Sequence, residues 1–147
     1  MTKRFLLLAA VHLFLLRDDA VLLLRRFNTG YEDGNYSVVA GHLDGDEDVI
    51  AAAIREAREE TGIILAPDDV TVVGVMHRKA TDERIDFFLT ASRWTGTIRN
   101  AEPEKCDALT WFPRDALPKN VIPYIRRALD NERHGQWFDR YGWPERS

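Results

Sequence analysis

One stretch decides the fold of this chain: Gly41-His42-Leu43-Asp44-Gly45-Asp46-Glu47 and, after seven further residues, Arg55-Glu56-Ala57-Arg58-Glu59-Glu60-Thr61-Gly62-Ile63. Three of its acidic residues, Glu56, Glu59 and Glu60, stand at positions i, i+3 and i+4 and therefore share one face of a helix. A separate apolar stripe is formed by Ile50, Ala53, Ile54 and Ala57. The stretch predicts an amphipathic helix with one face on the core and one acidic face.

The acidic face has two interpretations. Like charges at helical spacing destabilise a helix by about 0.2–0.5 kcal/mol per pair, so a face that only contacts water more often alternates the sign of its charges. A divalent cation would remove this repulsion, and Mg2+ prefers carboxylate oxygens, water and substrate phosphates as ligands. We therefore interpret the face as a metal site, with a solvated acidic face as the alternative.

Length and charge limit the function classes. With 147 residues the chain has the size of one domain, and we expect a single domain over residues 1–147. Its 30% charged and 45% hydrophobic residues are typical of a globular protein. The net charge of -4 argues against binding to long nucleic acid, which usually requires a basic surplus. A small phosphorylated ligand stays compatible, because bound cations can supply positive charge locally.

The cysteine content and the N-terminal region bear on localisation. Cys106 is the single cysteine, so a disulfide or a cysteine zinc site within one chain is excluded, and a reducing cytoplasm fits best. Lys3-Arg4 and the apolar run Phe5–Leu16 resemble a secretory signal, but no small-residue cleavage site follows. Twelve residues are also too few to cross a bilayer as a helix. We interpret the run as a buried strand and expect no membrane association.

Hydrophobic periodicity predicts an α/β fold. Turn-forming residues gather at 28–35, and Gly62 is placed to end the acidic helix, which we expect to begin near Asp46 or Glu47. A second amphipathic helix is indicated around residues 122–129, and the aromatic tail at residues 137–144 should dock on the rest of the chain. Strands are expected at Phe5–Leu16, Ala20–Arg26, Tyr36–Ala40, Val70–Met76, Ile85–Trp94 and Ala108–Phe112.

The spacing Gly-x5-Glu-x7-Arg-Glu-U-x-Glu-Glu-x-Gly-U, where U is aliphatic, resembles the signature of the Nudix (MutT-like) hydrolases. It is matched by Gly41, Glu47, Arg55, Glu56, Ala57, Glu59, Glu60, Gly62 and Ile63. The resemblance implies an α/β/α sandwich around a central mixed sheet, and cleavage of a nucleoside diphosphate linked to another moiety. One departure precedes the helix, where many members carry Pro-Gly-Gly and this chain has Val39-Ala40-Gly41. The loop geometry, and with it the substrate fit, is therefore open.

The resemblance also implies roles for the matched residues. Glu56, Glu59 and Glu60 would bind Mg2+ (or Mn2+) ions that bridge the substrate pyrophosphate, with the carbonyl of Gly41 as a further ligand. Arg55 can reach Glu59 at i+4 and hold that carboxylate in place, or it forms an ordinary surface pair. We interpret Glu47 as structural.

Family members also use a carboxylate outside the signature as a metal ligand or general base. Glu102 and Glu104 are the candidates; we prefer Glu104, and an ordinary solvated loop is the alternative to both. The segment that holds them, Glu102-Pro103-Glu104-Lys105-Cys106 with Trp111-Phe112 and Leu117-Pro118 after it, looks like that of members hydrolysing nucleoside triphosphates.

Residues that could contact the nucleoside are less strongly indicated. Asn28 and Tyr31 lie in the loop where the family places such contacts, although a plain turn explains them equally well. His77 and Phe87, together with Trp111, could line a base pocket, although strand aromatics more often belong to the core. We assign no role to the other three histidines, His12, His42 and His134.

The sequence therefore predicts a Mg2+-dependent pyrophosphohydrolase that converts a nucleoside triphosphate, normal or modified, to a monophosphate and pyrophosphate. Rival activities are the hydrolysis of ADP-sugars or dinucleoside polyphosphates and the removal of a capped RNA 5' end. A nucleotide-sensing module without catalysis is the alternative from another class. Because some related members pair, and because the tail is aromatic, a homodimer is a further hypothesis.

Overall fold

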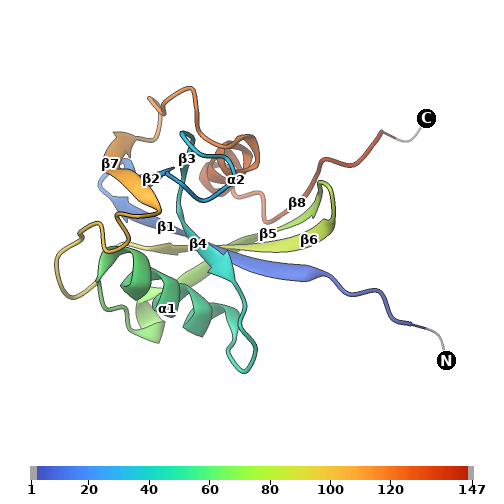
Figure 1. The fold of residues 1–147 in the computed structure, drawn as a ribbon, viewed down its shortest axis with the longest axis horizontal. Helices are drawn as coiled ribbons and strands as arrows, with labels where there is room; N and C mark the ends of the chain where they lie inside the picture. Colours follow the sequence, from blue (N-terminus) through green and yellow to red (C-terminus); the bar gives the residue numbers. More distant parts are fainter. Residues whose placement is uncertain (1–2, 146–147) are drawn as a thin grey trace.

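The computed structural model describes residues 3–145, which form a mixed sheet with a helix on each side (Figure 1). This confirms the predicted α/β class and the layered sandwich. The elements follow in the order β1 (Leu8–Arg17), β2 (Ala20–Arg26), β3 (Tyr36–Ser37), β4 (Val39–His42), α1 (Val49–Thr61), a short 3-10 turn (Pro67–Asp69), β5 (Thr71–Lys79), β6 (Glu83–Ala91), β7 (Cys106–Pro113), α2 (Pro123–Arg133) and β8 (Phe138–Tyr141).

Strand β1 is the centre of the sheet, whose order is β3-β2-β1-β6-β5-β8. Its first half pairs with β4 antiparallel and with β6 parallel, so that Ala10 lies between His42 and Asp86. Its last residues pair with β2, which also pairs with β7. The sheet therefore divides along β1 into two arms, and this division leaves room for a cleft beside β4.

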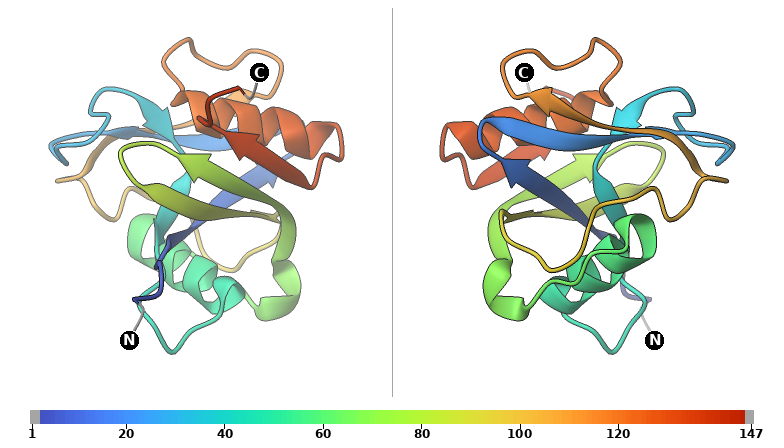
Figure 2. Two further views of the ribbon diagram at one scale, coloured as in Figure 1. Left: turned by 90° about the vertical axis from the view of Figure 1, so that its right-hand side faces the viewer. Right: turned by 90° about the vertical axis from the view of Figure 1, so that its left-hand side faces the viewer.

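The two faces of β1 enter two different cores. Because successive side chains of a strand point to opposite faces, Val11 and Leu13 pack with the alanines of α1, whereas Phe14 packs with Ile125 of α2. Figure 2 shows the same arrangement from the side, with α1 and α2 on opposite sides of the sheet. A strand buried on both faces reads as a continuous apolar run, which explains the composition of this region.

Strand β1 and helix α1 both begin later than the sequence predicts. Phe5 and Leu6 precede β1 and are 71% and 84% exposed. Helix α1 begins at Val49, and Asp48 is its cap, with Oδ1 accepting a hydrogen bond from the Ala51 amide at 2.8 Å. Asp46 cannot start a helix because its φ is 56°. The predicted end is confirmed: Gly62 adopts the left-handed conformation with φ 78°.

The aromatic tail docks on the sheet, as predicted. Strand β8 pairs with β5 in parallel, and the indole Nε1 of Trp143 donates a hydrogen bond to the His77 carbonyl at 2.9 Å. Trp137 and Phe138 stay largely exposed. Across residues 3–145 we find no helix with the length and apolar character needed to cross a membrane.

Candidate active site

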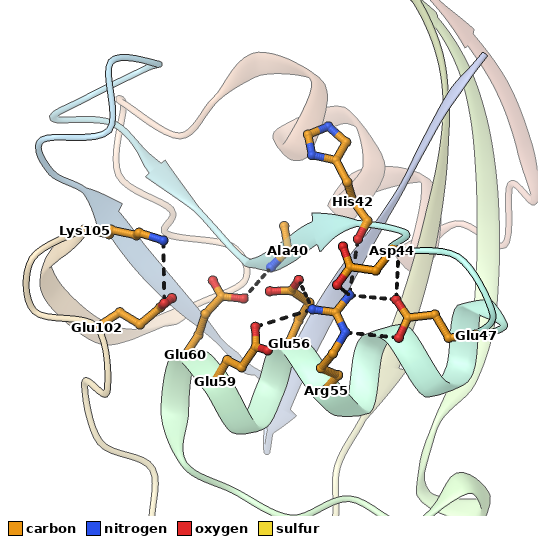
Figure 3. Close-up of polar contacts among 10 residues, drawn as sticks. All are labelled: Ala40, His42, Asp44, Glu47, Arg55, Glu56, Glu59, Glu60, Glu102 and Lys105. Atoms are coloured by element: carbon orange, nitrogen blue, oxygen red, sulfur yellow. Dashed lines mark hydrogen bonds and ion pairs between the residues drawn. The ribbon is translucent and has the colours of Figure 1, made fainter. Parts of the chain in front are cut away.

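The acidic face of α1 opens into a cleft of about 600 Å3 between the two arms of the sheet. Figure 3 shows Glu56, Glu59 and Glu60 side by side on α1, beneath β4. Oε2 of Glu60 accepts a hydrogen bond from the Ala40 amide at 3.2 Å. All three carboxylates line the cleft, as does Gly41. The spacing in the sequence and the position of β4 therefore bring these groups to one place.

Gly41 is glycine for a local reason. A Cβ atom at this position would lie 2.1 Å from Oε1 and 2.3 Å from Cδ of Glu56. Any other residue would therefore occupy the space that the Glu56 carboxyl now fills. The glycine of the signature allows β4 to approach α1 closely, and it leaves the carboxylate pressed against the backbone.

Arg55 organises the acidic groups. Its Nη2 and Nε atoms donate to the two oxygens of Glu47 at 2.7 and 3.0 Å, and its Nη1 donates to Glu56 at 2.7 Å and to Glu59 at 3.4 Å. It also donates to the His42 carbonyl at 3.2 Å. Glu47 can reach Arg55 because it precedes the helix instead of belonging to its first turn. Hydrogen bonds from Arg55 hold the pKa of Glu47 below its usual value.

Two of the carboxyls are unusually basic. Burial raises the pKa of Glu60 well above its usual value, and the neighbouring carboxyl of Glu56 raises it further. Burial likewise raises the pKa of Glu56, although Arg55 opposes the effect. Two partly buried carboxylates in contact repel each other, so either a proton or a cation is favoured between them. This is the electrostatic condition of a cation site.

The donor set suits a divalent metal. Hard cations take carboxylate and carbonyl oxygens, which Glu56, Glu60 and the Gly41 backbone offer together. Within residues 3–145, however, no three acidic, histidine or cysteine side chains already stand close enough to enclose an ion. Glu59 is 48% exposed and bonded to Arg55, so a rotation of its side chain would be needed for it to join the other two.

In the loop at residues 102–106, the geometry favours Glu102 over Glu104 as the additional carboxylate. Glu102 lines the cleft, and Nζ of Lys105 lies 3.8 Å from its Oε2. Its charge also contributes to the raised pKa of Glu60. Glu104 is exposed and lies outside the cleft lining, because the chain turns between Glu102 and Cys106, whose amide bonds to the Glu102 carbonyl. Our preference for Glu104 is thus corrected to Glu102.

The loop at residues 28–35 contributes Tyr31 but not Asn28 to the cleft lining. Tyr31 is 49% exposed at the mouth, and the guanidinium of Arg26 lies 5.2 Å from its ring centroid. The loop is ordered by Asp33, which accepts hydrogen bonds from Thr29 and from the Gly30 amide. Asn28 adopts a positive φ of 55°, which suits a turn, and its expected role in substrate binding stays a prediction.

His77 and Phe87 lie away from the cleft, which corrects the expected base pocket. The ring of His77 packs against Trp143 at 4.8 Å, and Phe87 packs against the core beneath α1. The reason is the alternation of the strands: Arg78, which follows His77, lines the cleft, and Asp86, which precedes Phe87, accepts a hydrogen bond from Arg78. Trp111 also belongs to a core, where it stacks on Trp94 at 6.2 Å.

The sequence reasoning missed a buried polar cluster on the cleft floor. Asp86 is fully buried and accepts hydrogen bonds from Nε2 of His12 at 3.0 Å and from Nε of Arg78 at 2.7 Å. Burial alone would raise the pKa of Asp86, but these two partners hold it below its usual value. The guanidinium of Arg78 lies 3.7 Å from the ring centroid of Tyr124. Charged residues inside apolar strands were the signal that could have revealed this cluster.

A second groove of about 680 Å3 lies against α2, lined by arginines 114, 126, 127 and 133. Arg114 and Arg127 pair with Glu132 and Asp139, respectively. None of the three carboxylates of α1, Glu56, Glu59 and Glu60, lines this groove. The chemistry that the signature residues imply therefore belongs to the smaller cleft, beside α1.

Comparisons with known proteins agree on one family. A family model described as NUDIX domain matches residues 6–138. The chain is 32% identical over 109 residues to the Mus musculus protein 8-oxo-dGDP phosphatase NUDT18, a match covering 71% of this chain and 32% of that protein. The chain thus spans about a third of the length of the curated relatives it matches.

Solved structures share the fold. The crystal structure of a MutT NUDIX hydrolase from Burkholderia pseudomallei has a TM-score of 0.78 and 28% identity, covering 86% of this chain and 98% of that one. The crystal structure of an ADP compounds hydrolase has a TM-score of 0.69 and 22% identity, covering 86% of this chain and 71% of that one. The second likeness concerns the fold alone.

Proposed function

This chain belongs to the Nudix family of hydrolases, which act on phosphoanhydride bonds and generally use divalent metal ions, and from this premise we propose that it is a Mg2+-dependent nucleoside triphosphate pyrophosphohydrolase. In the proposed reaction, a nucleoside triphosphate and water give a nucleoside monophosphate and pyrophosphate. Normal and modified nucleotides both belong to the proposed substrate class. Mn2+ would replace Mg2+ at the same oxygen ligands.

The observation that carries the proposal is the pair of partly buried carboxyls, Glu56 and Glu60, held against the backbone of β4 at the wall of the cleft. With Glu59 and the Gly41 carbonyl they would hold the metal. When bound, a divalent ion screens phosphate charge and makes a water more acidic. Arg55 keeps the carboxylate of Glu56 in position through the hydrogen bond that it donates at 2.7 Å, whereas Glu59 would turn from Arg55 toward the metal.

Glu102 is the proposed proton acceptor for the attacking water. It lines the cleft, where Figure 3 shows it beside Glu60, and it is not one of the carboxylates proposed to hold the metal. Nζ of Lys105 lies 3.8 Å from its Oε2. Carboxylates already bound to a metal are poor bases, so a separate acceptor is needed.

Hydrolysis of nucleoside diphosphates to monophosphates and phosphate is the second candidate. The relative NUDT18 is described as an 8-oxo-dGDP phosphatase, and its match covers 71% of this chain. The two candidates differ in the group that leaves, pyrophosphate or phosphate.

The decisive experiment incubates the protein with Mg2+ and a panel of nucleoside triphosphates, diphosphates, ADP-sugars and dinucleoside polyphosphates, and identifies the products by mass spectrometry. We expect pyrophosphate from triphosphates. Glu59→Gln and Glu60→Gln should each lower kcat/KM by at least about 100-fold, while the exposed Asp68→Asn leaves it unchanged. Tight nucleotide binding without turnover of any substrate would instead identify a sensing module.

Two further expectations accompany this proposal. We propose that residues 1–147 act as one domain in the cytoplasm on small nucleotides, and that two chains pair. The tail that suggested pairing docks on its own sheet, but Trp137 and Phe138 remain exposed on it. A monomeric mass in light scattering would exclude the dimer.

A further inference from the structure

Arg78 is a buried arginine at the floor of the cleft. It is 5% exposed and lines the cleft beside Tyr124. Its Nε donates to Oδ2 of Asp86 at 2.7 Å, and its Nη2 lies 3.4 Å from Oδ1 of the same carboxylate. Burial of a guanidinium is costly unless it is paired, and here the pair is backed by His12 on the other side of Asp86. The side chain is therefore held in one position.

One end of this guanidinium is left for a ligand. Among residues 3–145, hydrogen bonds to protein atoms are formed by Nε and Nη2, and none is formed by Nη1. Nη1 is not fully enclosed by protein atoms, and the residue lines the cleft. The face of the guanidinium stacks on Tyr124 at 3.7 Å, which leaves its edge as the interacting part. An arginine edge offers donors only, so its ligand must offer acceptors.

The position of Arg78 separates it from the acidic face of α1. Gly41 lies on β4, and the strands β1, β6 and β5 follow in order, which puts about 14 Å between the backbones of β4 and β5. Phosphates held near Glu56 and Glu60 would therefore place the nucleoside, not the phosphate chain, toward Arg78. The fixed donors at this end are suited to the acceptors on a base edge.

We propose that Arg78 recognises a 6-oxopurine base by donating hydrogen bonds to O6 and N7, so that the cleft prefers guanine and hypoxanthine nucleotides over adenine nucleotides. This inference rests on the proposed function, because it takes the cleft to be a nucleotide site. Guanine presents two adjacent acceptors, O6 and N7, which match the fork formed by Nη1 and the second N–H of Nη2, because Asp86 accepts from Nε and from only one N–H of Nη2. Adenine presents an amino donor in place of O6, and this donor opposes the guanidinium. Asp86 and Tyr124 contribute by fixing the plane in which Arg78 donates.

The first test changes the ligand and leaves the protein intact. Dissociation constants are measured by calorimetry for GMP, IMP, 7-deaza-GMP, AMP and ribose 5-phosphate. We expect GMP and IMP to bind equally, because both carry O6 and N7. Loss of N7 in 7-deaza-GMP, or of O6 in AMP, should weaken binding by about tenfold each. Equal affinities for GMP and AMP, or GMP that binds no tighter than ribose 5-phosphate, would overturn the proposal.

The second test changes the arginine. Lysine keeps the positive charge beside Asp86 but lacks the planar fork, so Arg78→Lys should lower the affinity for GMP and IMP to that for AMP. The affinity for ribose 5-phosphate should not change. The matched control is Arg93→Lys, since Arg93 is an exposed surface residue that pairs with Asp69 at 3.3 Å. An equal loss for GMP and ribose 5-phosphate would show that Arg78 binds phosphate and would refute base recognition.

The two proposals fail in different ways. Absence of hydrolysis with every metal and nucleotide contradicts the proposed function, while the preference among monophosphates is still measured by binding. Hydrolysis of guanine and adenine nucleoside triphosphates with equal kcat/KM, together with equal binding of GMP and AMP, contradicts only the role of Arg78.

Discussion

Replacing Gly41 with alanine tests whether the close approach of β4 to α1 serves the chemistry. The new Cβ would lie 2.1 Å from Oε1 of Glu56, whereas an ordinary contact is at least 3.4 Å. The carboxyl must therefore retreat by roughly 1.3 Å, and its 2.7 Å hydrogen bond with Arg55 is disturbed. A misplacement of about 1 Å in a reacting geometry can lower a rate by about 100-fold. We expect kcat/KM to fall by about that factor.

Stability should change much less than activity. The clashing atoms are the end of a flexible side chain, and the backbone of Gly41 does not have a positive φ, so alanine fits its conformation. Overpacking and the disturbed hydrogen bond should together lower the free energy of unfolding by about 1–2 kcal/mol. For a chain of this size, the melting temperature would decrease by about 2–8 °C. The variant thus remains folded at 25 °C while its turnover falls.

The assay measures kcat/KM and the Mg2+ concentration for half-maximal rate in wild type, Gly41→Ala, Glu56→Asp and the double variant. Aspartate shortens the side chain by one carbon–carbon bond of about 1.5 Å, which would give the new methyl group room. We expect the double variant to be more active than the product of the two single effects predicts. An activity of Gly41→Ala within about threefold of wild type would refute the geometric reasoning. An additive double variant would indicate that the Gly41 backbone, not the carboxylate, is sensitive.

Three further predictions follow from the same contacts. Without metal, the free energy of unfolding should fall as the pH rises above the usual carboxyl pKa of 4.5, because the raised pKa of Glu60 makes the folded state bind an extra proton. Urea titrations in the presence of a chelator from pH 5 to 8 should show a flatter dependence of this free energy on pH for Glu60→Gln than for wild type. Identical pH profiles for the two proteins would contradict this prediction. Glu102→Gln should lower kcat by at least about 100-fold and Glu104→Gln by less than about threefold, which single-turnover kinetics would check. A larger loss in Glu104→Gln than in Glu102→Gln would identify Glu104 as the proton acceptor. Gly62→Ala should lower the free energy of unfolding by about 1 kcal/mol without lowering kcat/KM, because Gly62 has a φ of 78° and lies against Arg99; an unchanged melting temperature would exclude this strain.

The part of the site that could be predicted is the part that depends on local spacing. Residues three and four apart on a helix share a face wherever the helix lies, so the positions of Glu56, Glu59 and Glu60 followed from the sequence. The left-handed end at Gly62 is equally local. The contact between Gly41 and Glu56 depends on the distance between β4 and α1, and no spacing along the chain determines that distance.

The part that could not be predicted depends on which face of a strand each residue occupies. A shift of one position exchanges the faces, and β5 carries an irregularity between Val72 and Gly74 that changes the alternation within the strand. Aromatic character alone suggested His77, whereas the neighbouring Arg78 lines the cleft. A charged residue between two apolar ones, as Asp86 is between Ile85 and Phe87, would have been the better guide, because a buried charge requires a partner.

The two ends of the cleft are built from separate polar networks that are joined by β1. Arg55 and Glu47 hold the carboxylates of α1, whereas Asp86 and Tyr124 hold Arg78. Within the described part of the chain, no hydrogen bond links one network to the other. Strand β1 pairs with β4 on one side and with β6 on the other, so its register fixes how far apart the two ends lie. The network on α1 can therefore keep its carboxylates in one arrangement, while the network around Arg78 on the cleft floor determines which ligand reaches from one end of the cleft to the other.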